Sequence, residues 1–164
     1  MKAEAENKID QMIRLLNDSI YHRDESVFSA LEGVKKNESA WQHPAYSEEV
    51  HRQGMPTPGT IGWHVAHLVH SCEHYAAMIY ERPVQNEPET RPPGVHEITE
   101  LISTLRKAHE KLVRAVSVIP DSELSGNCAR GMTLDEFLRM IIRHNTWHAS
   151  QIRLLRRLWQ NNEK

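Results

Sequence analysis

The sequence predicts an all-α protein, a bundle of four main helices around one core. Three observations indicate this architecture. Four segments carry apolar residues at spacings of three and four, clusters of Gly and Pro separate those segments, and no alternating apolar pattern is long enough for a sheet. A chain of 164 residues has the size of one domain, so we expect a single domain over residues 1–164. A chain of this size buries about two-thirds of its unfolded surface, so it needs neither a disulfide nor a metal to fold.

The first two segments each place their apolar residues on one stripe of a helix. The stripe of the first is Ile9, Met12, Ile13, Leu16 and Ile20, and a second short helix follows with Val27, Phe28, Leu31 and Val34. The next segment begins after Thr60, whose hydroxyl is a suitable N-cap. Its stripe is Ile61, Val65, Leu68, Cys72, Tyr75 and Ile79.

The last two segments have equally clear boundaries. The third ends before Pro120, because proline cannot continue a helix, and its stripe is Ile98, Leu101, Ile102, Leu105, Leu112, Val116 and Ile119. The fourth opens with Thr133 and Glu136, which form a capping-box pattern, and continues to about Gln160. Residues 82–94 are too long for a tight antiparallel turn, so we expect them to cross over along the bundle.

Composition and charge exclude several classes of protein. Twenty Lys and Arg against 22 Asp and Glu give a net charge of -2, which argues against a general nucleic-acid binder. The longest apolar run, residues 76–80, is far shorter than the roughly 20 residues that span a bilayer. Residues 1–6 have no pattern of a signal peptide, and two cysteines are too few for a disulfide scaffold. We therefore expect a cytoplasmic protein that binds neither nucleic acid nor membrane.

Two histidines of the fourth segment lie on its core stripe, where apolar residues are the rule. His144 and His148 are four residues apart, so their rings lie on adjacent turns of one face and can grip one metal ion. Gln151 lies on the same face and could orient a ligand or a bound water. Two tryptophans of this segment, Trp147 and Trp159, are expected in the core or at a dimer interface, with the core favoured.

The second segment offers a complementary set of histidines. His67, His70 and His74 share one side of the helix, whereas His64 lies nearer the apolar stripe. Periodicity therefore favours His64 as the inward residue, but it does not decide which histidine completes a site. Cys72 is expected to be a buried core residue. The other histidines are expected on the surface or in loops: His22, His43, His51, His96 and His109.

Three stretches of the chain resemble motifs of the DinB/YfiT-like superfamily. Residues 60–68, Thr-Ile-Gly-Trp-His-Val-Ala-His-Leu, are similar to that family's second helix, in which a histidine followed by Leu or Ile is the first metal ligand. Residues 143–152, Arg-His-Asn-Thr-Trp-His-Ala-Ser-Gln-Ile, resemble its closing His-x3-His-x2-Gln-Ile motif, with Ser150 where the family often has Gly. Residues 26–34, followed by Ala-Trp at 40–41, resemble the segment between its first two long helices.

The resemblance implies a four-helix bundle of the DinB/YfiT-like type, often a homodimer, with a divalent metal at one end. Carried over residue by residue, it implies that the ligands are His67, His144 and His148, in place of the His64 that periodicity favours. Some members of the family are transferases that join low-molecular-weight thiols such as bacillithiol or mycothiol to electrophiles, and others have been described as metal-dependent hydrolases. The metal, whether Zn, Ni or Fe, is not readable from the sequence, because imidazole suits each of them.

Three functions follow as hypotheses. The first is a transferase in which the metal activates a low-molecular-weight thiol against a small-molecule electrophile. The second is a hydrolase that uses metal-bound hydroxide, with a carboxylate or histidine as base; Glu73 points away from His67 and is disfavoured in that role. The third is a non-enzymatic helical dimer with a structural or adventitious metal. Three arginines near the end of the chain either attract an anionic thiol or form a solvated face: Arg153, Arg156 and Arg157.

Overall fold

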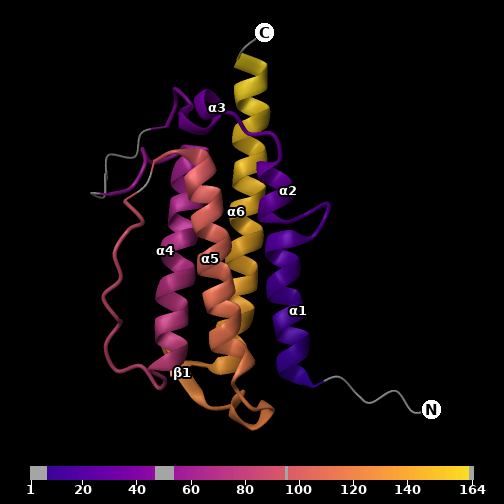
Figure 1. Cartoon of the computed structure of the whole chain (residues 1–164), viewed down its shortest axis with the longest axis vertical. Helices are drawn as coiled ribbons and strands as arrows, with labels where there is room; N and C mark the ends of the chain where they lie inside the picture. Colours follow the sequence, from indigo (N-terminus) through magenta and orange to yellow (C-terminus); the bar gives the residue numbers. More distant parts are fainter. Residues whose placement is uncertain (1–6, 47–53, 95, 163–164) are drawn as a thin grey trace, which may run out of the picture.

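The computed structural model describes residues 7–46, 54–94 and 96–162 and has four long helices lying side by side (Figure 1). These helices are α1 (Lys8–Tyr21), α4 (Ile61–Tyr80), α5 (Ile98–Ser117) and α6 (Leu134–Asn162). The short elements between them are α2 (Val27–Leu31), α3 (Lys36–Ala40), the 3-10 helix η1 (Asp121–Glu123), and strands β1 (Asn127–Ala129) and β2 (Met132–Thr133). The all-α architecture expected from the sequence is confirmed.

The helix boundaries lie where the capping residues place them. The Thr60 hydroxyl accepts a hydrogen bond from the backbone N–H of Trp63, at 3.0 Å, and so caps α4. At the start of α6, Thr133 donates its backbone N–H to the Glu136 carboxylate at 2.8 Å. Its hydroxyl in turn accepts from the Glu136 N–H at 3.3 Å, which completes the capping box.

The connection between α4 and α5 runs along the bundle, as expected. Figure 1 shows α1 and α6 running in one direction and α4 and α5 in the other, with the chain after α4 returning beside that helix to the point where α5 begins. Its segment 82–94 is fixed to α4 by Thr90, whose hydroxyl lies 3.0 Å from His70 Nε2 and 3.1 Å from His74 Nδ1. The crossover therefore covers the side of α4 that carries these two histidines.

The core is formed by the apolar stripes of the four long helices, and side chains such as Leu16, Leu68, Leu105 and Phe137 are completely buried. Cys72 lies among them and is 1% exposed. Burial, with a smaller contribution from Glu73, raises the pKa of its thiol to about 12. Cys72 is thus the inert core cysteine that its position predicts.

A small β-hairpin between α5 and α6 was not expected from the sequence. Strands β1 and β2 pair antiparallel across a two-residue turn, in which Arg130 has φ 55° and Gly131 has φ 72°. Positive φ at both turn residues is typical of the type I′ turn that joins the two strands of a hairpin. Strands of three and two residues are too short to give an alternating pattern. In the part of the chain that the structure describes, no helix is long and apolar enough to cross a membrane.

Candidate metal centre

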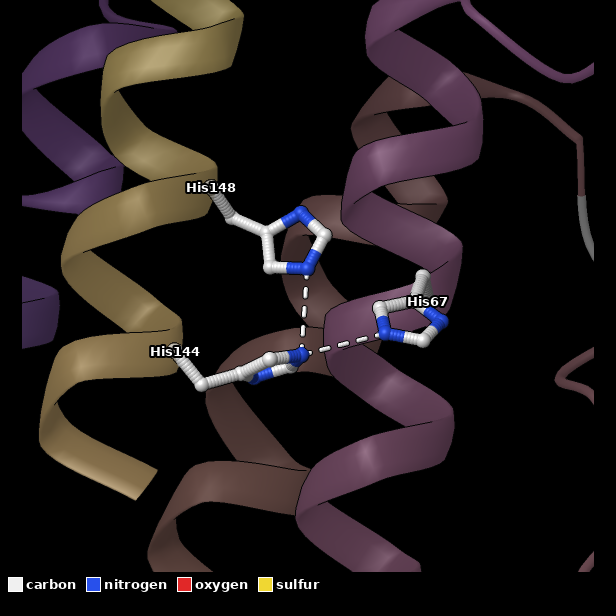
Figure 2. A group of neighbouring side chains, drawn as sticks. All are labelled: His67, His144 and His148. Carbon is white, nitrogen blue, oxygen red and sulfur yellow. Dashed lines mark hydrogen bonds between the residues drawn. The ribbon is translucent and has the colours of Figure 1, made fainter. Parts of the chain in front are cut away.

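Three histidines from two antiparallel helices meet in the interior of the bundle (Figure 2). His67 comes from α4, and His144 and His148 come from adjacent turns of α6. The Nε2 atom of His144 lies 3.1 Å from His67 Nε2 and 3.1 Å from His148 Nε2. One nitrogen of each ring lies within 4.8 Å of the others, so the three residues that the resemblance implied are brought together and could hold one metal ion.

The geometry of these nitrogens fits a metal better than a hydrogen-bonded cluster. Ligands about 2.0–2.1 Å from one ion lie about 2.8–3.0 Å apart in octahedral and about 3.3–3.4 Å apart in tetrahedral geometry, and the two separations of 3.1 Å lie between these values. Without an ion, His144 Nε2 faces two ring nitrogens at once, although its single lone pair or single proton serves only one of them well. A cation between the three lone pairs removes this conflict.

Burial keeps the α6 histidines neutral, which is the state that binds metal. Burial, with smaller contributions from the neighbouring His64, His144 and His67, lowers the pKa of His148 to about 2. Burial, followed by the positive charge of Arg130, also lowers the pKa of His144. Both rings are therefore neutral near pH 7, and each has one N–H group and one nitrogen lone pair that can bind a metal.

Aromatic side chains fix the orientation of the three rings. Trp63 stacks on His67, with ring centres 5.1 Å apart and planes at 9°. The Tyr75 ring lies edge-on to His144 at 5.8 Å, and Trp147 lies edge-on to His148 at 4.7 Å. Trp147 is nevertheless 53% exposed, so the favoured place for it, the core, was wrong, and the alternative of a dimer interface stays a prediction. It covers the outer side of the histidine cluster, whereas Trp159 is half-buried.

His64 is buried, as periodicity favours, but it lies behind the cluster. Its Nδ1 atom is 2.8 Å from Nδ1 of His148, on the side of that ring opposite the Nε2 that faces His144. Its side chain is 6% exposed. The inward position of His64 and the ligand position of His67 are therefore compatible, because the two residues meet different atoms of the α6 histidines.

The remaining histidines lie outside the cluster. His70 and His74 contact Thr90 of the crossover, and His74 Nε2 is also 3.2 Å from Glu87. His22 and His96 are exposed and His43 is half-buried in a loop, as expected, while His51 lies outside the described residues. His109 was expected on the surface, but it is 1% exposed and packs against α1. That prediction was wrong because its position on the edge of the α5 stripe faces Asn17, whose side-chain oxygen is 3.0 Å from His109 Nε2.

The other candidate residues are engaged elsewhere. The Glu73 carboxylate is 4.0 Å from Lys111 Nζ on α5, which agrees with its disfavoured role as base. Gln151 lines a cavity of about 240 Å³ together with His64. Arg156 donates to the buried Glu38 carboxylate at 2.8 Å, and Arg153 donates to the Ser29 hydroxyl at 2.7 Å. These two arginines therefore tie α6 to the segment of α2 and α3, and neither forms a solvated face.

Comparison with known families agrees with these features. The sequence profile of the DinB superfamily matches residues 21–152, which include His67, His144 and His148. The chain belongs to the DinB superfamily. No curated protein and no solved structure gives a significant match. The family suggested by the motifs at 60–68 and 143–152 is thereby confirmed, and a DinB-superfamily bundle here carries a possible three-histidine site.

Proposed function

We propose that this DinB-superfamily protein is a metal-dependent transferase that uses a low-molecular-weight thiol as its nucleophile. The observation that carries the proposal is the convergence of His67, His144 and His148, three neutral ligands with no carboxylate among them. His148 is buried, whereas His67 and His144 are half-buried, so the cluster has one side nearer solvent. Three protein ligands leave coordination positions open, as is typical of catalytic rather than structural sites.

A divalent metal held by these residues lowers the pKa of a coordinated thiol and so supplies a thiolate near neutral pH. The residues of the chain would orient this chemistry. His148 would hold the ion from the buried side, and Trp63, which stacks on His67, fixes the orientation of the His67 ring. In the reaction, the thiol loses its proton to solvent. Its sulfur then forms a bond to an electrophilic carbon, and a leaving group departs with the electron pair of the broken bond.

The surroundings of the cluster favour a thiol over water as the nucleophile. Hydrolysis needs a more strongly acidified nucleophile, and a carboxylate base commonly assists it. Two acidic residues of α4 and the crossover have other partners: Glu73 faces Lys111, and Glu87 binds Arg130 through both oxygens at 2.7 and 3.2 Å. A thiol has an ordinary pKa of about 8.5 and needs no such base.

Arg130 adds a positive charge on the side of the crossover. The two positive φ angles of the hairpin turn place it near α4, where it binds Glu87 and lowers the pKa of His144 by its charge. Glu87 already pairs with this guanidinium through both oxygens, so a carboxylate-bearing thiol would bind Arg130 only by replacing Glu87 as its partner.

The metal site is tested by metal content and affinity of untagged protein. We expect about one divalent metal per chain in the wild type, measured by elemental analysis after reconstitution with Zn²⁺. His67→Ala and His144→Ala should each lower the affinity for Zn²⁺ by at least about 100-fold, because each removes one of three ligands. The matched controls are His70→Ala and His74→Ala on the same helix, which should retain wild-type affinity. Equal losses in all four variants would refute the assignment.

The reaction is tested with 1-chloro-2,4-dinitrobenzene as electrophile and cysteine, bacillithiol or mycothiol as thiol. Thiol transfer predicts formation of the conjugate only when metal, thiol and protein are all present, and its loss in His144→Ala. Turnover of p-nitrophenyl acetate without thiol would instead support a hydrolase. A metal-loaded protein inactive in both assays would support the third hypothesis, in which the helical dimer is non-enzymatic.

A further inference from the structure

The two ring nitrogens of His148 face two different histidines. Its Nε2 atom lies 3.1 Å from His144 Nε2 inside the cluster, and its Nδ1 atom lies 2.8 Å from Nδ1 of His64. Both side chains are almost completely buried, at 1% exposure for His148 and 6% for His64. Two buried ring nitrogens at this distance need one proton between them, because two bare lone pairs would repel and two N–H groups would clash.

Metal ligation decides which ring supplies that proton. A neutral imidazole carries one proton, and the nitrogen that binds a metal must be bare. If His148 Nε2 is the ligand, the proton of His148 is on Nδ1, and His148 is the donor to His64. His64 then accepts at Nδ1 and carries its own proton on Nε2. The residue also lines the cavity of about 240 Å³, together with Gln151 and Leu155.

We propose that His64 is a positioning residue, which accepts the Nδ1–H of His148 and thereby directs the Nε2 lone pair of His148 at the metal. Metal-bound histidines generally donate their other N–H to a carboxylate, a carbonyl or water, and these partners orient the ring. A neutral imidazole in this place adds no negative charge. The metal consequently keeps more of its positive charge than it would beside a carboxylate, which strengthens its acidifying effect on a bound nucleophile. This inference rests on the proposed metal site but not on the identity of the nucleophile.

The aromatic neighbours of His64 fix the direction in which its ring faces His148. Its ring meets Trp63 edge-on at 5.1 Å and Trp147 at 6.0 Å, and both aromatic contacts restrict rotation of the imidazole. Packing thus holds the His64 ring in place. An apolar residue of similar size could fill the same space, but it would lack the nitrogen that accepts the hydrogen bond.

Two substitutions separate the acceptor from the packing. His64→Leu keeps apolar bulk but removes the acceptor, and we expect its affinity for Zn²⁺ to fall by about 10- to 100-fold in competition with a chelator. His64→Asn keeps a side-chain oxygen near the place of Nδ1, and we expect it to bind within about threefold of the wild type, since the acceptor is retained. The matched control is His70→Leu, which removes a histidine of α4 that contacts Thr90 instead. Circular dichroism of the metal-free proteins checks that each variant is folded.

A spectroscopic measurement on the wild type tests the same inference without any substitution. In the Zn²⁺-loaded protein, long-range ¹H–¹⁵N spectra distinguish the two imidazole tautomers, and we expect the Nδ1–H form for His148 and the Nε2–H form for His64. The opposite tautomers would overturn the proposal. So would the same affinity for Zn²⁺ in His64→Leu and His64→Asn, whether both bind like the wild type or both bind more weakly by the same factor. A wild type that binds no Zn²⁺ overturns this inference together with the metal centre. A metal-loaded protein that fails every thiol assay refutes only the proposed function.

Discussion

The buried His109 gives a quantitative prediction for the pH dependence of stability, independent of any metal. This residue of α5 is 1% exposed, its Nε2 is 3.0 Å from the side-chain oxygen of Asn17, and its ring meets Tyr21 edge-on at 5.4 Å. Its Nδ1 atom has no hydrogen-bond partner among the described residues. Burial lowers the pKa of His109 from 6.5 to about 4, because a protonated ring in this position would lose most of its hydration.

The sign and size of the effect follow from proton linkage. Between these two pKa values the unfolded chain binds a proton at His109 and the native protein does not, so acid favours unfolding. The stability contributed by the neutral ring is complete above pH 6.5 and is lost as the pH falls toward 4. With these two pKa values, His109 lowers the free energy of unfolding, relative to its value at high pH, by about 0.8 kcal/mol at pH 6 and about 2 kcal/mol at pH 5.

The assay compares metal-free wild type with His109→Leu by urea denaturation at pH 7.5, 6 and 5. Other buried histidines also have lowered pKa values, among them His64 and His148, but they are present in both proteins and cancel in the difference. The unfolding free energy of the wild type should therefore fall between pH 7.5 and 5 by about 2 kcal/mol more than that of the variant. Parallel pH profiles would refute the claim that His109 is buried in its neutral form.

Two further predictions concern the segment that closes one end of the bundle. Arg156→Met should lower the unfolding free energy by about 3–5 kcal/mol in urea denaturation. The substitution leaves the Glu38 carboxylate, whose side chain is 3% exposed, without its positively charged partner. A loss below about 1 kcal/mol would contradict this. Gly59→Ala should cost more than Gly33→Ala, whose left-handed backbone alone costs about 1–2 kcal/mol. Both glycines have similar φ, +72° and +71°, but only at Gly59 would a Cβ lie 2.6 Å from the Tyr46 ring, so equal losses would count against that contact.

The helices were predictable because local signals and core periodicity agree. Thr60 and Thr133 start α4 and α6 through side-chain hydrogen bonds that are formed within four residues of sequence. The apolar stripes predicted which helix faces are buried, and the length of the segment 82–94 predicted that it crosses over along the bundle. Each of these features depends on neighbours along the chain or on the simple need to bury one face of a helix.

The features that could not be predicted depend on contacts between distant residues. His109 is buried because Asn17 of α1 supplies a hydrogen-bond partner, which the sequence of α5 does not reveal. Trp147 is half exposed although its ring packs against His64 and His148. Arg156 leaves the solvent because Glu38 is buried opposite it. In each case the exposure of the side chain depends on contacts with residues distant in the sequence rather than on its own hydropathy.

Which histidine of α4 meets the histidines of α6 depends on the register of the two helices. Periodicity within one helix does not determine that register. The two helices are antiparallel, so a step forward along α4 is matched by a step backward along α6 (Figure 1). His64 lies against His148, His67 against His144 and, further along, Tyr75 against Phe137, with the same number of residues from the first contact to the last in both helices. A register shifted by one turn would have brought His70 to the α6 histidines instead, with the same stripes buried. The hydrophobic pattern tolerates either register, so the family motif was needed to select His67, while His64 contacts the other ring nitrogen of His148.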